Sequence, residues 1–156
     1  MIKKSIFIVL LLFVSSAFSE ESIHFSTLST GVYASGIEEK VEMVFYDSSA
    51  FSNFINSIYK GTTPPPITPK IDFKKEMVIA VSPGPKPSGG YSVEIIEIKD
   101  MGKKIEVIVL LGEPDPNYTV TMAITQPHHI VTVLKSEIAA SGAIEDIPVE
   151  FVWRNE

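Results

Sequence analysis

Short apolar runs recur along the chain about every ten residues, and this spacing constrains the fold more than any other feature of the sequence. The runs lie at residues 23–33, 41–46, 77–81, 91–98, 105–111, 118–125, 129–135 and 149–153. In most of them the apolar residues alternate with other residues, which is the period of a strand with one buried face. We therefore predict a mainly β fold, either an antiparallel β-sandwich or a curved sheet.

Two parts of this pattern give specific predictions. Residues 91–98 and 105–111 are separated by a short turn that contains Asp100 and Gly102, which indicates an antiparallel hairpin. Residues 118–125 alternate strictly, with apolar side chains at Tyr118, Val120, Met122 and Ile124. This alternation predicts the clearest half-buried strand of the chain.

One amphipathic helix is predicted after the run at 41–46. Its apolar residues recur at helical spacing: Phe51, Phe54, Ile55, Ile58 and Tyr59. Asp47 or Ser48 can cap its start, and Gly61 follows its end. We expect the helix to pack this aromatic stripe on a sheet.

Residues 1–19 are typical of a secretory signal peptide. Lys3 and Lys4 precede an apolar stretch from Ile6 to Val14, and the segment ends in the small-x-small sequence of residues 17–19. We expect residues 20–156 to form a single β domain that is exported to the periplasm or the extracellular space. No membrane span is expected after removal of the signal.

The composition excludes several classes of protein. The chain contains no cysteine, so disulfides, thiolate metal sites and a lipoprotein anchor are excluded. Loss of Lys3 and Lys4 with the signal takes the formal charge from −6 to −8, and no basic stripe is present. Nucleic acid is therefore not expected as a partner.

The sequence predicts no catalytic site, no cofactor site and no metal site. The Gly-x-Ser-x-Gly elbow of many serine hydrolases is absent, and Ser88 is expected to be a turn residue. His128 and His129 are adjacent, so on a strand they would point to opposite faces. We expect one packed and one solvated histidine, and not a shared metal site.

A shaped surface loop is predicted at residues 86–91. It consists of Lys86, Pro87, Ser88, Gly89, Gly90 and Tyr91. Glycine lets another backbone approach closely, proline limits the entropy lost on docking, and tyrosine offers area and a hydroxyl. A second proline-containing break consists of Gln126, Pro127 and His128. We expect both loops at one end of the fold as a partner-binding surface; alternatively, the glycines only serve a turn.

Several blocks taken together resemble the PrcB family, the C-terminal domain type of protease complex subunit PrcB. They are Ile71–Phe73, Met77–Ala80, Lys86–Val93, Glu113–Pro114 and Gln126–Val131. The similarity runs from about Phe25 to Lys135. It implies an accessory subunit of a secreted subtilisin-like protease complex, which binds or helps mature the protease and does not itself catalyse a reaction.

A second, more local similarity links residues 87–91 to the Pro-Thr-Thr-Gly-Tyr loop of chagasin-type cysteine-protease inhibitors. Only Pro87, Gly90 and Tyr91 match. Those inhibitors are immunoglobulin-like β domains, so a protease inhibitor with such a fold is the alternative function.

Overall fold

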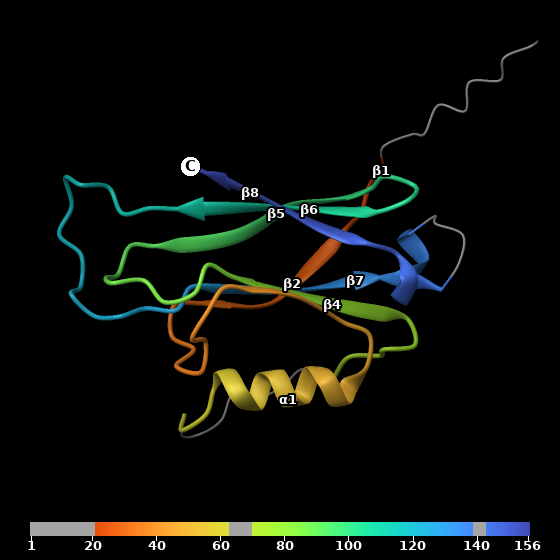
Figure 1. The fold of residues 1–156 in the computed structure, drawn as a ribbon, viewed down its shortest axis with the longest axis horizontal. Coiled ribbons are helices and arrows are strands. Elements are labelled where there is room, and N and C mark those ends of the chain that lie inside the picture. The colour runs from red at the N-terminus through yellow and green to blue at the C-terminus, as the bar shows by residue number, and fades with distance from the viewer. Residues whose placement is uncertain (1–20, 63–69, 139–142) are drawn as a thin grey trace, which may run out of the picture.

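The computed structural model describes residues 21–62, 70–138 and 143–156. Two four-stranded sheets face each other, and one helix covers the outer face of the second sheet (Figure 1). The predicted mainly β sandwich with one packed helix is confirmed. The helix of the described residues is too short and not apolar enough to cross a membrane. The predicted signal peptide, residues 1–19, lies outside the described residues.

Sheet one contains the predicted hairpin. Its strands, in spatial order, are β1 (Glu21–Ser22), β5 (Ser92–Asp100), β6 (Ile105–Gly112) and β8 (Val149–Asn155). β5 and β6 pair antiparallel, as predicted. β8 runs parallel to β6, so the antiparallel prediction does not extend to this strand.

Sheet two is entirely antiparallel. Its strands, in spatial order, are β2 (Phe25–Gly31), β7 (His128–Leu134), β4 (Glu76–Ser82) and β3 (Val41–Phe45). The chain passes from β1 of sheet one into β2 of sheet two through Ile23 and His24. Two short 3₁₀ turns, Lys135–Glu137 and Ile144–Asp146, lie between β7 and β8.

β4 is buried on both faces, which explains its continuous apolar sequence. Met77, Ile79 and Val81 belong to the core between the two sheets. Val78 and Ala80 belong to the core between sheet two and the helix. Because side chains alternate along a strand, β4 serves both cores at once.

The helix α1 (Ser48–Ile58) forms where the apolar spacing predicts it. The Asp47 carboxylate caps it by accepting backbone N–H bonds of 2.9 Å from Ser49 and Ala50. Phe51, Ile55 and Ile58 are buried against sheet two, so the predicted packing of the stripe is confirmed.

The strand predicted at residues 118–125 is wrong. These residues form no strand, and only Thr125 makes a β-bridge, to Lys86. Tyr118, Met122 and Ile124 are 74%, 88% and 64% exposed. The segment extends from the end of the sandwich, where neither sheet offers it a ladder partner (Figure 1).

Candidate partner-binding surface

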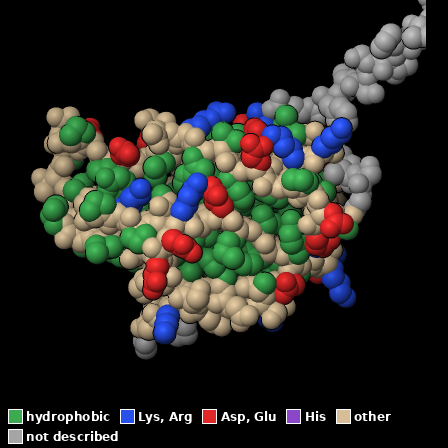
Figure 2. Space-filling view, viewed as in Figure 1, with side chains coloured by type: hydrophobic (Ala, Val, Ile, Leu, Met, Phe, Trp, Pro, Cys, Tyr) green, Lys and Arg blue, Asp and Glu red, His purple; other side chains and the backbone are tan. Residues whose placement is uncertain are grey.

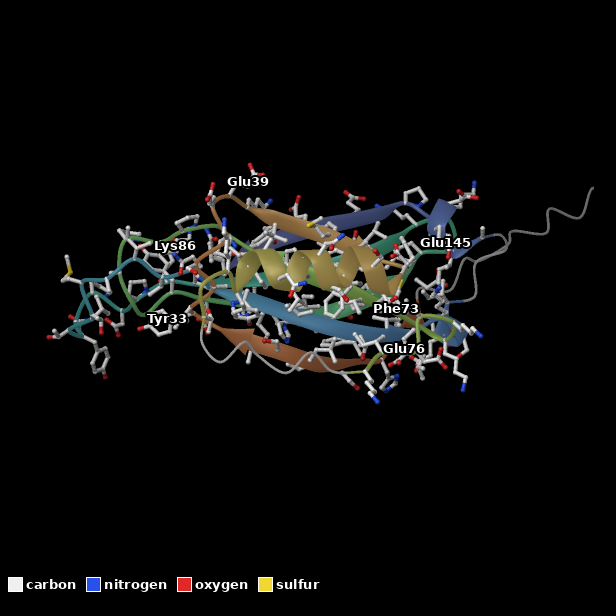
Figure 3. All side chains as sticks on the ribbon, turned by 90° about the horizontal axis from the view of Figure 1, so that it is seen from below. Tyr33, Glu39, Phe73, Glu76, Lys86 and Glu145 are labelled. Atoms are coloured by element: carbon white, nitrogen blue, oxygen red, sulfur yellow. The ribbon has the colours of Figure 1, made fainter. Side chains whose placement is uncertain are left out.

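The two predicted loops lie at the same end of the sandwich, which we call the loop end. The motif loop, residues 86–91, connects β4 to β5, and residues 113–127 connect β6 to β7. Figure 3 shows Lys86 and Tyr33, which follows β2, at this same end of the molecule. The structure therefore brings together all nine residues predicted to bind a partner, and their binding of a partner remains a prediction.

Backbone hydrogen bonds join the two loops. Lys86 and Thr125 exchange a pair of N–H to carbonyl bonds of 2.8 and 3.0 Å, and the Gly89 N–H donates to the Thr121 carbonyl at 2.8 Å. The Thr125 hydroxyl donates to the Ser88 carbonyl at 2.8 Å. The Gln126 N–H donates to the Val32 carbonyl at 2.7 Å, which adds the segment after β2. The loop end is thus a connected unit.

The contacts between the two loops bury several of the nine residues that were predicted to bind a partner. Ser88 is 8% exposed and His128 3% exposed, and Pro127 is also buried. Lys86, Gly89, Tyr91 and Gln126 are half-buried, whereas Pro87 and Gly90 are exposed. The motif loop therefore serves largely as a support for the segment that follows β6.

The two glycines of the motif loop differ. Gly90 has a φ of +86°, in the left-handed region, and a Cβ there would lie 2.7 Å from Pro114 Cβ and 3.0 Å from Val120 Cγ1. Gly89 is not among the positive-φ glycines, and a Cβ there would meet its nearest atoms, all of Thr121, at 3.6 Å or more. Only Gly90 requires glycine for its backbone angle.

Gly90→Ala is expected to lower the free energy of unfolding by about 1–3 kcal/mol, because it combines backbone strain with a contact to Pro114. Gly89→Ala is the matched control and should change stability by less than about 0.5 kcal/mol. Urea denaturation of both variants measures the difference. Equal losses in the two variants would contradict the distinct conformations of the glycines.

The loop end exposes several large apolar side chains. They are Tyr33, Tyr118, Met122 and Ile124, each at least 64% exposed. Figure 2 shows hydrophobic side chains gathered over this end of the molecule. The sequence alone does not identify these residues as exposed, because their alternation is equally the pattern of a half-buried strand.

His128 faces the helix. Its Nδ1–H donates to the Gln126 carbonyl at 3.3 Å, so its Nε2 accepts from the Tyr59 hydroxyl at 2.9 Å. Burial lowers the His128 pKa, and the hydrogen bond to Gln126 opposes this shift. The imidazole therefore ties the end of α1 to β7 in its neutral form.

His129 faces sheet one. Its Nδ1 accepts the Ile95 backbone N–H at 2.8 Å, so its Nε2–H donates to the Thr27 hydroxyl at 2.9 Å. It is 4% exposed, so the prediction of one solvated histidine is wrong. Both faces of β7 are covered, one by sheet one and the other by α1, which leaves neither histidine in water.

The serine and histidine side chains near this site make internal hydrogen bonds. Ser29 Oγ lies 3.5 Å from His128 Nε2, but the Tyr59 hydroxyl already occupies that nitrogen at the shorter distance of 2.9 Å. The Ser88 hydroxyl donates to the Gly89 carbonyl at 3.1 Å. Among residues 21–62, 70–138 and 143–156, no three histidine or acidic side chains are grouped to hold a metal ion.

Together these features define a β-sandwich domain that presents a connected set of loops at one end. Residues 77–133, which run from β4 into β7, match the family model described as PrcB C-terminal, and this match confirms the predicted resemblance to the PrcB family. The family match indicates a subunit associated with a protease complex. Comparisons with curated proteins and with solved structures give no match.

Proposed function

We propose that this chain is an exported, non-enzymatic accessory subunit that binds and stabilises a secreted subtilisin-like protease. The observation that carries the proposal is the PrcB C-terminal match, because it spans both loops of the loop end and the strands that support them. Loops held on a rigid sheet are common carriers of recognition.

The interactions within the loop end support binding more than chemistry. Its serine and histidine side chains are engaged in internal hydrogen bonds: Ser88 to a carbonyl, and His128 to Tyr59 and Gln126. Its backbone is fixed by the bonds between Lys86 and Thr125 before any partner arrives. A fixed loop loses little conformational entropy on docking.

Stabilisation of the protease follows from mass action. A subunit that binds only the folded protease lowers the population of its unfolded state, and excess subunit at 100 times the dissociation constant contributes about 2.7 kcal/mol. The loop end would supply the contact, through exposed Pro87 and Gly90 and half-buried Lys86, Tyr91 and Gln126.

The test uses the affinity-tagged mature chain, secreted by the organism that encodes it. A fluorophosphonate probe labels active serine proteases, so co-purification of a labelled protease with the tagged chain is the expected result. The same protease should also survive heating longer with the chain than without it. Failure of any labelled protease to co-purify would reject the proposal.

The same complex distinguishes the inhibitor alternative, which the match of Pro87, Gly90 and Tyr91 to the chagasin-type loop favours. An accessory subunit leaves the turnover of a peptide substrate unchanged while it extends the life of the protease. An inhibitor lowers turnover in proportion to the fraction of protease bound.

A further inference from the structure

Part of the segment after β6 exposes large apolar side chains. We call this part, residues Tyr118–Thr125, the tip. Met122 is 88% exposed, Tyr118 74% and Ile124 64%, although burial of large apolar side chains ordinarily stabilises the folded state. Tyr33, 66% exposed, belongs to the adjoining segment after β2. Grouped exposure of this kind marks an interaction site more often than scattered single residues do.

The tip carries no charge. From Asn117 to Thr125 the sequence contains no acidic or basic residue, in a chain with a formal charge of −6. The nearest charges before the tip are the exposed carboxylates Glu113 and Asp115. Depletion of charge at the centre, with tyrosine and methionine present, is the composition of protein–protein interface cores.

The motif loop supports the tip through backbone hydrogen bonds. The Thr121 carbonyl of the tip accepts the Gly89 N–H, and Thr125 of the tip pairs with Lys86. The close packing of Gly90 on Pro114 and Val120 adds a contact that no other residue would allow. These supports leave the side chains of Tyr118, Met122 and Ile124 pointing to solvent on a fixed backbone.

We infer that the tip, together with Tyr33, is the principal contact of the loop end, and that it inserts into an apolar groove on the protease; this inference rests on the proposed function. The tip projects beyond the ends of the sheets, so a concave partner fits it (Figure 1). The acidic residues at its base favour a groove with a basic rim. They also disfavour an anionic lipid surface, which attracts basic segments.

The buried motif residues have a supporting role in this arrangement. Ser88, Pro127 and His128 are buried, and the Ser88 carbonyl helps to position the tip, because it accepts a hydrogen bond from the Thr125 hydroxyl. The main contacts with the protease are then made by residues outside the motif, and the exposed motif residues Pro87 and Gly90 add to them. Substitutions at the tip should therefore affect partner capture without affecting the fold, because the tip side chains bury little surface within the chain.

The experiment compares two double variants in the fluorophosphonate co-purification assay. Met122→Ser with Ile124→Ser should reduce the captured labelled protease by about 30-fold, the loss expected for two interface anchor residues. Met43→Ser with Leu134→Ser is the matched control, because these residues are also exposed, at 44% and 45%, but lie away from the tip on β3 and β7. Melting temperatures establish that both variants are folded.

The outcomes separate the two proposals. If the wild-type chain captures no labelled protease, the proposed function fails, and the inference fails with it. If the wild-type chain captures the protease and the tip variant captures it equally well, the function stands and the tip assignment is overturned. Equal losses in the tip variant and the control would also overturn it.

Photo-crosslinking gives a readout that does not depend on affinity. A benzoylphenylalanine introduced in place of Met122 should form an adduct that carries the fluorophosphonate label, whereas the same group in place of Met43 should not. An adduct of two copies of this chain, formed through position 122, would assign the tip to self-association and overturn the inference. Binding of the purified chain to phosphatidylcholine vesicles through the tip would overturn it as well.

Discussion

Phe51→Ala is expected to lower the free energy of unfolding by about 3–5 kcal/mol, because it removes a buried aromatic ring and leaves a cavity. Phe51 is 2% exposed. Its ring centroid lies 5.5 Å from that of Phe45 on β3 and 6.1 Å from that of Phe73 before β4. The Asp47 cap fixes the start of α1 beside this site, which limits how far the helix can move to fill the cavity.

Urea denaturation at pH 7.5 measures the effect of Phe51→Ala. Ser52→Ala is the control, since Ser52 is the next residue of α1 and is exposed. It should change stability by less than about 0.5 kcal/mol. A loss below about 1 kcal/mol for Phe51→Ala would show that α1 contributes little to the stability of sheet two, and would identify its apolar face as a surface that a partner covers.

The sequence predicts the elements of the sandwich because local periodicity and core packing agree in them. β3, α1 and the hairpin of β5 and β6 lie where alternation, helical spacing and turn residues indicate. β4 could be predicted as a buried strand from its continuous apolar run. The parallel pairing of β8 with β6 could not be predicted, since the direction of a strand depends on the long connection that precedes it.

The tip shows the limit of periodicity. Alternation reports that one face of an extended segment is apolar, and it does not report what covers that face. The core between the sheets is already filled by residues of β4, β5, β6 and β7. No place in the sandwich is left for Tyr118, Met122 and Ile124. The same alternation that marks a core strand can therefore mark a binding segment.

The motif loop shows a different limit. Its composition indicates a shaped loop at the correct place, and its proximity to the second loop is as predicted. Which of its residues reach the surface depends on tertiary contacts. The burial of Ser88 comes from its packing with Thr125, which is distant in sequence and could not be inferred from the motif.

The stability of the domain is expected to fall as the pH decreases below about 6.5, chiefly because of His129. The His129 Nδ1 accepts the Ile95 N–H at 2.8 Å, so a proton on Nδ1 would set one N–H against another. Burial lowers the pKa of His129 from its ordinary value of 6.5, Glu94 on β5 opposes this shift, and His128 adds to it.

The direction of this pH dependence follows from the number of protons that the folded and unfolded states bind. Because the folded pKa of His129 lies below the unfolded value of 6.5, the folded protein binds fewer protons than the unfolded chain. The stability contributed by neutral His129 is fully present above pH 6.5 and decreases as the pH falls through 6.5 toward the folded pKa. His128 acts with the same sign, since burial lowers its pKa too, but the Tyr59 hydroxyl facing its Nε2 can accept a hydrogen bond from the protonated ring.

The variant His129→Leu separates the contribution of His129 to the pH dependence of stability from the contributions of other titratable groups. It leaves the Ile95 N–H unpaired between the sheets and removes the bond to Thr27, so it should cost about 2–4 kcal/mol at pH 7.5. His129→Asn is the matched variant, because its side-chain oxygen can take the place of Nδ1, and it should cost less. Both should lose less stability than the wild type between pH 7.5 and 5.5, whereas His128→Gln should keep most of the wild-type dependence. Urea denaturation at the two pH values decides: an unchanged pH dependence in His129→Leu would mean that the histidine between the sheets is not the acid-sensitive group.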